Sequence, residues 1–309
     1  MFEHFKGPKI SFAVICYNRE KYIHECMDSI LSQNIEKEII CIDDCSTDNT
    51  YGILSDYQNK YPEVKVFRND MNKGTVITRN EGMRRCTGEY MIFIDADDKV
   101  IGSYSELYGI AKTAKADILE FSAETDSENK NLYNMQRNDE TLNGNLLDLY
   151  SKGKISNTLC NKLISQKTYR KASRDIVIES PQPNYSDVVF FMFHILKHAK
   201  TCVSTCKVGY YYYSSRGMTS QLSSTERLKQ YCFFANTKHD LEMVYGAIPE
   251  LHNTWNKVCN QAVCTWLELN EKDQNEYYPL LLDLMSEINA QYLINEYRKK
   301  SEPSNDSFS

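Results

Sequence analysis

The stretch TGEYMIFIDADD at Thr87–Asp98 decides the fold class of this 309-residue chain. Its centre, Tyr90–Ile94, is a short apolar run without polar alternation, and it passes directly into Asp95-Ala96-Asp97-Asp98. A run of this kind predicts a strand buried on both faces, which is typical of the parallel sheets of α/β proteins. The carboxyl end of that strand is therefore expected to present a cluster of acidic side chains.

Three similar runs precede this one and alternate with helical patterns. They cover Ile10–Ile15, Glu38–Ile42 and Val64–Phe67, and after each run the apolar residues return at helical spacing. We expect Asn18 to cap the first of these helices. Strands and helices that alternate over short links form βαβ units. The sequence therefore predicts an α/β fold with a mostly parallel central sheet and helices on both faces.

Polar and acidic residues follow three of the predicted strands. Tyr17 comes after the first strand, Asp43 and Asp44 follow the second, and Asp95–Asp98 follow the fourth. Parallel strands bind ligands where their carboxyl ends meet, so these side chains should lie at one edge of the sheet. Crowded carboxylates need a compensating cation, and Mg²⁺ or Mn²⁺ is usually held by one or two carboxylates together with substrate phosphates. Asp43 or Asp44 would alternatively accept a hydrogen bond from a nucleobase. The simplest alternative is that these residues are solvated turns and helix caps.

Four segments, in this order and spacing, carry a resemblance to a known family. They are SFAVICYNRE at Ser11–Glu20, IDDCSTD at Ile42–Asp48, NKGTVITRNEG at Asn72–Gly82 and TGEYMIFIDADD at Thr87–Asp98. This region resembles the nucleotide-sugar half of glycosyltransferase family 2, whose members have the Rossmann-like GT-A fold. Fainter likenesses follow at Cys160–Lys171, Tyr185–Lys200 and Gly209–Gln221, so the resemblance covers about residues 10–222.

The resemblance implies an inverting, metal-dependent glycosyltransferase. Such an enzyme moves a sugar from a nucleotide diphosphate sugar, most often a UDP-sugar, to a hydroxyl of a glycan or lipid-linked glycan acceptor, here in bacterial surface-polysaccharide or glycolipid assembly. Asp95-Ala96-Asp97 matches the DxD motif of the family, in which Asp97 would bind Mn²⁺ or Mg²⁺. Asp95 would contact the metal, the ribose or the sugar, and Asp98 would have a supporting role.

The resemblance also assigns residues to the nucleotide of the donor and to the acceptor. The residues implied to contact the nucleobase are Ile15, Tyr17 and either Asp43 or Asp44. The residues implied to lie near the phosphates or the ribose are Arg79 and Asn80. More weakly, Lys162, Arg216 and Ser220 are candidates for diphosphate or acceptor contacts.

Asp187 matches the aspartate of the family's Glu-Asp pair and would be the catalytic base. An acceptor hydroxyl is a poor nucleophile until a carboxylate takes its proton. Ser186 stands where the family commonly has Glu, although the apolar pattern after Asp187 is retained. The alternative is that Ser186 and Asp187 only cap the following helix, and both roles are compatible.

The chain after the acidic motif is expected to contribute the acceptor side. We predict a GT-A catalytic domain over residues 1–222, with a nucleotide-sugar half at about 1–100 and an acceptor half at 101–222. The polar segment Thr125–Asn145 is expected to be a solvated loop or an acceptor lid, and Tyr210–Tyr213 a strand with aromatic residues on both faces.

A C-terminal helical region with a disordered tail is predicted over residues 223–309. Its helices would pack on the catalytic domain or form a homodimer interface, and a turn is expected from Leu267 to Lys272. The cluster Arg298–Lys300 motivates the hypothesis of a weak peripheral contact with the inner membrane face.

Composition excludes several other classes of protein. The net charge is -6 and no basic run offsets it, so no nucleic-acid partner is expected. No apolar stretch has the length of a membrane span, and Met1–Lys9 lacks the apolar core of a signal peptide, so we expect a cytoplasmic protein. The eleven cysteines are then reduced thiols. His194, His198, Cys202 and Cys206 lie four residues apart, but the predicted strand at Thr201–Val208 would separate them, which disfavours a zinc site.

Three rival functions share features of the acidic motif. A phosphatase of the haloacid dehalogenase type would carry its acidic pair on an early strand, usually followed by Thr or Val, whereas Lys99 follows Asp98 here. A nucleotidyltransferase would show a Gly-rich basic loop near the N-terminus, where this chain has Cys16-Tyr17-Asn18. A nucleotide-sugar-binding protein without turnover stays open, because intact motifs do not prove catalysis.

Overall fold

The chain forms two compact units, Met1–Ser220 and Gln221–Ser309. The computed structural model describes residues 7–127, 135–176, 187–216, 223–225, 227–228, 252–284 and 292–295. The part of Thr125–Asn145 that covers residues 128–134 lies outside the described residues, as do Ser186, Ser220, Arg298–Lys300 and the C-terminal tail. The predictions made for these segments stay predictions.

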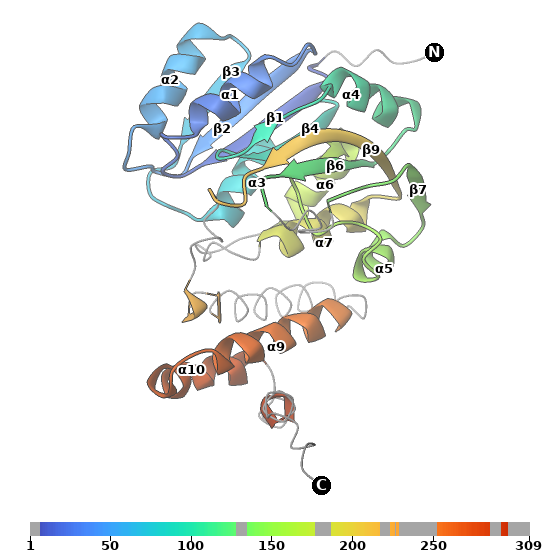
Figure 1. Ribbon diagram of the computed structural model, residues 1–309. Helices are drawn as coiled ribbons and strands as arrows, with labels where there is room; N and C mark the ends of the chain where they lie inside the picture. The colour runs from blue at the N-terminus through green and yellow to red at the C-terminus, as the bar shows by residue number, and fades with distance from the viewer. Residues whose placement is uncertain are drawn as a thin grey trace. The chain divides into compact units, whose positions relative to one another are not determined.

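The first unit is built on one mixed sheet, with nine strands in the described part of the chain (Figure 1). Four parallel strands in the order β3-β2-β1-β4 form one half, and β8-β6-β9-β5 continue it, with β7 paired to β9. Strand β8 is antiparallel to both β4 and β6. The bounds are β1 Ile10–Cys16, β2 Lys37–Asp43, β3 Val64–Arg68, β4 Tyr90–Asp95, β5 Lys99–Val100, β6 Ile118–Thr125, β7 Glu140–Asn143, β8 Lys162–Ser165 and β9 Thr201–Tyr212.

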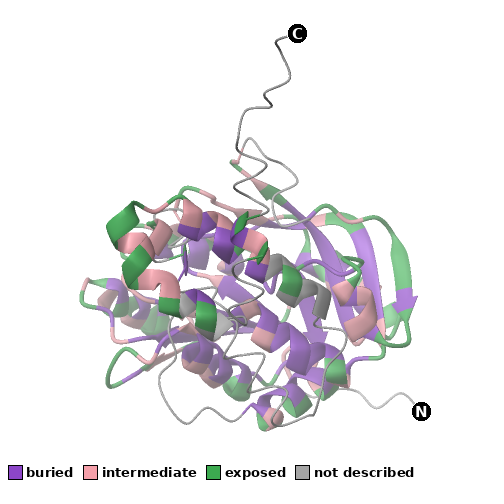
Figure 2. Cartoon of the chain, turned by 90° about the horizontal axis from the view of Figure 1, so that it is seen from below, coloured by how far each residue is buried: buried purple, intermediate pink, exposed green. Residues whose placement is uncertain are grey.

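Helices cover both faces of this sheet, as predicted (Figure 1). One face carries α1 (Ile23–Leu31), α2 (Thr50–Lys60) and α4 (Tyr104–Thr113). The other face carries α3 (Thr75–Arg85), α5 (Leu146–Ser151), α6 (Gln166–Asp175) and α7 (Asp187–His198). The central strands are thereby buried on both sides, and Figure 2 shows them largely in the colour of buried residues.

Side-chain alternation along the strands divides the core between the two faces. In β4, Ile92 and Ile94 pack with the α1 side, whereas Met91 and Phe93 pack with the α3 side. All four are fully buried, which explains why the strand reads as an uninterrupted apolar run. Each such aliphatic or aromatic side chain contributes about 1.5–3 kcal/mol by leaving water.

The strand register brings the predicted ligand-binding residues to one edge. Cys16 lies opposite Asp43, and Ile15 lies opposite Asp95, because β2 and β4 flank β1 in parallel. The prediction that these strand ends meet is therefore confirmed.

The predicted cap of the first helix is wrong. Helix α1 begins at Ile23, and Asn18 has a φ of 52°, outside helical geometry. The Asn18 side-chain oxygen instead accepts a hydrogen bond from the Thr47 backbone N–H at 2.8 Å. Asn tolerates this left-handed conformation, and the contact docks the loop after β1 on the loop after β2.

The second unit contains two helices in the described residues 252–284. These are α9 (His252–Leu267) and α10 (Glu271–Leu284), and the predicted turn lies between them. Val263, Trp266 and Leu281 are buried in their small core. The Trp266 indole N–H donates to the Gln274 carbonyl oxygen at 2.9 Å. Among the residues that the structure describes, no helix combines the length and apolar character that a bilayer crossing requires.

Candidate active site

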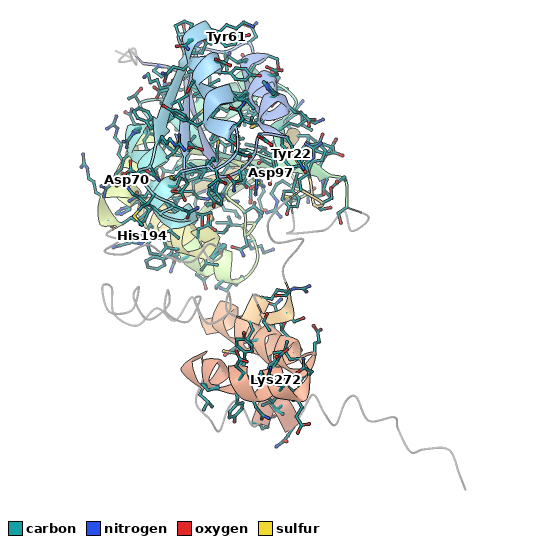
Figure 3. All side chains as sticks on the ribbon, turned by 90° about the vertical axis from the view of Figure 1, so that its left-hand side faces the viewer. Tyr22, Tyr61, Asp70, Asp97, His194 and Lys272 are labelled. Carbon is teal, nitrogen blue, oxygen red and sulfur yellow. The ribbon has the colours of Figure 1, made fainter. Side chains whose placement is uncertain are left out.

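The acidic motif forms a tight turn between β4 and β5 at the carboxyl edge of the sheet. The Asp98 backbone N–H donates to the Asp95 carbonyl oxygen at 3.0 Å. Asp97 and Asp98 are buried, whereas the Asp95 side chain is 35% exposed. Figure 3 labels Asp97 at this edge together with Tyr22, which precedes α1.

The surroundings of the Asp97 side chain disfavour its ionised form. Burial raises its pKa to about 6, the nearby Asp95 carboxylate adds to the shift, and Arg19 opposes it. The Arg19 Nε atom lies 3.2 Å from Asp97 Oδ2. Arg19 thus faces Asp97 in a turn that contains three aspartates, and additional positive charge would stabilise the ionised form of Asp97.

Asp98 faces inward and anchors β9 to the turn. Its carboxylate accepts hydrogen bonds from the Tyr210 hydroxyl and the Tyr213 backbone N–H, each at 2.8 Å. Burial, followed by the charges of Asp95 and Asp97, raises the pKa of Asp98 well above its ordinary value. Tyr210 is fully buried, and the predicted strand at Tyr210–Tyr213 is confirmed through Tyr212. The supporting role predicted for Asp98 corresponds here to holding the turn.

Arg79 joins the acidic turn to Asp187. Its Nη2 atom lies 2.6 Å from Asp95 Oδ1, and its Nε atom lies 2.5 Å from Asp187 Oδ2. Burial lowers the pKa of the guanidinium, but the two carboxylates outweigh this effect and raise it. The guanidinium also lies over the Phe93 ring, with 5.6 Å to the centroid. Arg79 is therefore a fixed bridge between two carboxylates that are 92 positions apart in the sequence.

Asp187 is the first residue of α7 and is 7% exposed. The family resemblance implies that Asp187 and the acidic motif share one site, and Arg79 contacts both Asp187 and Asp95. A carboxylate at a helix N-terminus is also favoured by the helix dipole, so the capping role and a chemical role are compatible in this position.

Asp43 and Asp44 differ sharply in their surroundings. Asp44 accepts hydrogen bonds from Asn69 Nδ2 at 2.7 Å and from the backbone N–H groups of Lys73 and Gly74 at 2.8 and 2.9 Å. These contacts shape the turn before α3. Asp43 is fully buried, and among the described residues its Oδ1 atom has no hydrogen-bond partner. Of the two, Asp43 is the one with an acceptor left for a ligand.

The other residues predicted to hold the donor lie along the same edge. Ile15 and Tyr17 are half-buried at the end of β1 and in the loop that follows. Asn80 on α3 is 7% exposed, and no described residue pairs with its buried Oδ1 atom. Ala96 is buried within the turn.

Lys162 does not face a ligand, contrary to the sequence-based prediction. It is fully buried, and its Nζ lies 3.0 Å from Glu120 Oε1, also fully buried. The same ammonium donates to the carbonyl oxygens of Ser156 and Thr158 at 3.1 and 2.7 Å. All three hydrogens of an ammonium group are used in such a cage, so Lys162 stabilises the interior of the sheet.

Arg216 lies beside the acidic turn, as its prediction requires. Its guanidinium stacks on the Tyr213 ring at 3.4 Å from the centroid and pairs with Glu25 Oε2 at 2.7 Å. It also approaches the Asp97 carbonyl oxygen at 3.5 Å. Glu25 itself was not predicted.

Two further arginines were missed by the sequence analysis. Arg19 follows Tyr17 in the loop after β1, and Arg68 ends β3 directly opposite Asp43. A signal existed for both residues, because each follows or ends a predicted strand at the edge where ligands bind.

The four-residue spacing of histidines and cysteines does not form a cluster. His194 and His198 lie on α7, whereas Cys202 and Cys206 lie on β9, which confirms the predicted strand. His198 Nε2 lies 2.6 Å from Asp175 Oδ2.

The residues present fit a divalent ion only in combination with a ligand. Within the described ranges, no group of three or more His, Cys, Asp and Glu side chains could hold a metal by itself. Mg²⁺ and Mn²⁺ are commonly bound by one or two carboxylates and by substrate phosphates. Asp97, with Asp95 beside it, supplies that number of hard oxygen ligands, next to the guanidinium groups of Arg19 and Arg79.

Comparison with known proteins decides the family. Residues 11–174 match the sequence family described as glycosyl transferase family 2. The chain belongs to this family. This chain is 41% identical to a poly(ribitol-phosphate) β-glucosyltransferase from Bacillus spizizenii over 116 positions. These positions cover 36% of this chain but only 18% of that relative. A cholesterol galactosyltransferase from Borreliella burgdorferi is 28% identical over 264 positions, which cover 81% of this chain and 72% of the relative.

Solved structures establish the fold of this family 2 chain. Staphylococcus aureus TarS, residues 1–349 in complex with UDP-GlcNAc, superposes with a TM-score of 0.66 at 20% identity, over 94% of this chain and 92% of that chain. The mannosyltransferase PcManGT from Pyrobaculum calidifontis, in complex with GDP-Man and Mn²⁺, gives a TM-score of 0.56 at 14% identity, over 94% and 85%. The predicted GT-A fold is therefore confirmed.

Proposed function

We propose that this chain is an inverting, metal-assisted glycosyltransferase that moves a sugar from a UDP-sugar to a hydroxyl of a glycan or glycolipid acceptor. Membership of family 2 supports glycosyl transfer as the reaction, and the donor, the metal and the stereochemistry are the finer parts of the proposal. The observation that carries it is the Arg79 bridge, because it joins the acidic motif that would receive the donor to the carboxylate that would act on the acceptor.

The donor would lie along the carboxyl edge from β2 to β4. Asp43 would accept a hydrogen bond from the base through its unpaired Oδ1, and Ile15 and Tyr17 would line the base. Arg79 and Asn80 would lie near the ribose and phosphates. The known complex of TarS with UDP-GlcNAc supports a uridine nucleotide.

Asp97, with Asp95, would hold Mn²⁺ or Mg²⁺ against the diphosphate of the donor. When bound, the ion supplies Lewis-acid stabilisation of the charge that develops on the leaving nucleoside diphosphate. The bound Mn²⁺ of PcManGT supports a divalent metal in this fold. The raised pKa of Asp97, at about 6, indicates that this position gains from added positive charge.

Asp187 would take the proton of the acceptor hydroxyl as the new bond forms. Arg79 holds one oxygen of this carboxylate, Oδ2, and thereby fixes its orientation. A single in-line displacement at the anomeric carbon inverts its configuration, so an α-linked donor would give a β-linked product. A positioned general base typically accelerates such a step by about 10²–10⁴-fold.

For the acceptor we propose only its chemical class, a glycan or glycolipid with a free hydroxyl. The relatives named above act on poly(ribitol phosphate) and cholesterol, which are chemically unlike each other but share a free hydroxyl. We propose residues 101–222 as the acceptor half and surface-polysaccharide or glycolipid assembly at the cytoplasmic membrane face as the setting.

Thermal unfolding with a panel of UDP, GDP and CDP, each with and without Mn²⁺, tests the proposal. We expect UDP with Mn²⁺ to stabilise the protein most, since a ligand at 100 times its dissociation constant adds about 2.7 kcal/mol. Asp97→Asn should remove the metal-dependent part, and Asp56→Asn, an exposed residue of α2, is the matched control. Stabilisation by GDP or CDP compounds instead would refute the choice of base. Binding of UDP-sugars without transfer to any acceptor would favour a binding protein without turnover.

A further inference from the structure

We propose that Arg68 is a positioning residue that makes the site select uracil, by leaving Asp43 a single free carboxylate oxygen to face the base. The inference rests on the proposed function, because it assumes that a nucleotide binds at Asp43. It goes further by naming what sets the choice of base. Arg68 ends β3, and in the parallel register it lies directly opposite Asp43 at the end of β2.

The two oxygens of Asp43 have different surroundings. Oδ2 lies 3.2 Å from Arg68 Nε and accepts a hydrogen bond from the Ser46 backbone N–H at 3.2 Å. Oδ1 has no hydrogen-bond partner among the described residues, although the side chain is fully buried. A buried acceptor without a partner is unfavourable in the free protein, and a ligand that donates to it relieves the penalty.

Arg68 is itself held in place by its neighbours. Its Nη2 atom donates to the Ser46 carbonyl oxygen at 2.9 Å. Its guanidinium lies over the Tyr51 ring, 4.7 Å from the centroid. The cation is thus held against Oδ2 of Asp43, and Oδ1 is the oxygen that no described residue contacts by a hydrogen bond. Burial raises the pKa of Asp43, and hydrogen bonds from Ser46 and the charge of Arg68 oppose that shift, so Arg68 also helps to keep the carboxylate an acceptor.

One free oxygen matches one donor on the base. Uracil presents a single ring N–H between two carbonyl groups. Guanine presents two adjacent N–H donors, which pair best with both oxygens of a carboxylate, and here Oδ2 is already occupied. Cytosine and adenine carry a lone pair on the corresponding ring nitrogen and would be repelled by the carboxylate. The Arg68–Asp43 pair therefore favours uracil, because Oδ2 of Asp43 already has hydrogen-bond partners and only Oδ1 is left to accept from the base.

Isothermal titration calorimetry of the full chain with UDP, GDP and CDP tests the inference. We expect wild-type protein to bind UDP most tightly. Arg68→Gln should weaken UDP binding by about tenfold or more, because a charge-assisted contact that orients the acceptor is lost. GDP binding should change by less, since Asp43 Oδ2 then keeps only the hydrogen bond from the Ser46 N–H and can accept a second one from guanine. Arg68→Lys retains the charge and should recover part of the loss.

Arg85→Gln is the matched control. Arg85 on α3 also stacks on an aromatic ring, that of Phe67, with 4.4 Å to the centroid, and it pairs with Glu81. Its substitution should leave the affinities for all three nucleotides unchanged.

The outcomes separate this inference from the proposed function. If wild-type protein binds none of the three nucleotides, the proposed function fails. If it binds UDP and Arg68→Gln weakens UDP, GDP and CDP by equal factors, Arg68 has only a structural role and the inference is overturned. Unchanged UDP affinity in Arg68→Gln, at wild-type melting temperature, overturns it as well.

Discussion

Removing the Arg79 guanidinium should destabilise the first unit strongly. In Arg79→Met, Asp187 would lose the cation that lies 2.5 Å from its Oδ2, and its side chain is only 11% exposed. Breaking a buried pair by removing one partner costs about 3–5 kcal/mol, because the remaining charge is left without compensation. The Asp95 contact adds about 1 kcal/mol at most, since that side chain is 35% exposed and water can solvate it. We therefore expect a loss of about 3–6 kcal/mol in the free energy of unfolding.

The assay must report the first unit and not the second. The chain has two tryptophans, Trp255 and Trp266, and both lie in the unit Gln221–Ser309, so tryptophan emission reports the wrong unit. Urea unfolding followed by near-ultraviolet circular dichroism in the tyrosine band reports mostly the first unit, which holds 16 of the 22 tyrosines, among them the buried Tyr90, Tyr104 and Tyr210.

A double-mutant cycle shows whether the buried pair causes the loss. Asp187→Asn in the Arg79→Met background removes the uncompensated charge and should recover part of the lost stability, with an interaction energy of about 1–3 kcal/mol. Arg79→Lys retains the charge but not the forked geometry, so its loss should be intermediate. A loss below about 1 kcal/mol in Arg79→Met, or strict additivity in the cycle, would refute the reasoning.

Three further predictions follow from the same contacts. Lys162→Met leaves the buried Glu120 with Arg137 as its remaining cation, 3.0 Å from Oε2, and should cost about 1–3 kcal/mol by urea unfolding. A loss below about 0.5 kcal/mol would contradict this. Burial lowers the pKa of His194 from 6.5 to about 4. Below pH 6.5 the unfolded chain therefore takes up a proton that the folded protein does not. The free energy of unfolding should be highest above pH 6.5 and should fall by about 3 kcal/mol as the pH drops to 4. His194→Gln should abolish that part of the pH dependence, and an identical pH profile in the variant would disprove it. Asp187→Asn should retain UDP affinity within about threefold but lose transfer by about 10²–10⁴-fold, and unchanged turnover would exclude it as the base.

The half of the fold that forms the donor edge follows directly from sequence patterns. Uninterrupted apolar runs such as Tyr90–Ile94 are typical of strands that are covered on both faces, and a helix between two successive strands makes parallel neighbours possible. Once those two facts are combined, the meeting of Asp43 with Asp95 across β1 is a matter of register. The sequence order of the motifs therefore predicted most of the edge.

The second half of the sheet depends on contacts that local patterns do not encode. Strand β8 has four residues and inserts antiparallel between β4 and β6, so nothing within its own segment specifies its neighbours. Lys162 on this strand has the local appearance of a surface lysine. Its burial is possible only because Glu120, 42 positions earlier, provides a carboxylate in the same layer. Pairing at this separation is visible only in three dimensions.

The arginines of the site follow one physical rule. Arg19, Arg68 and Arg79 each lie against one oxygen of a buried or half-buried aspartate, at Asp97, at Asp43, and at Asp95 with Asp187. Carboxylates that must accept hydrogen bonds or bind a cation have to be ionised before the ligand arrives, and burial opposes ionisation. A guanidinium keeps its charge under burial and fixes the carboxylate plane through its forked geometry. The site thus combines charge compensation with orientation. Loss of Arg19 or of Arg68 should affect one subsite each, whereas loss of Arg79 should affect both the acidic turn and Asp187.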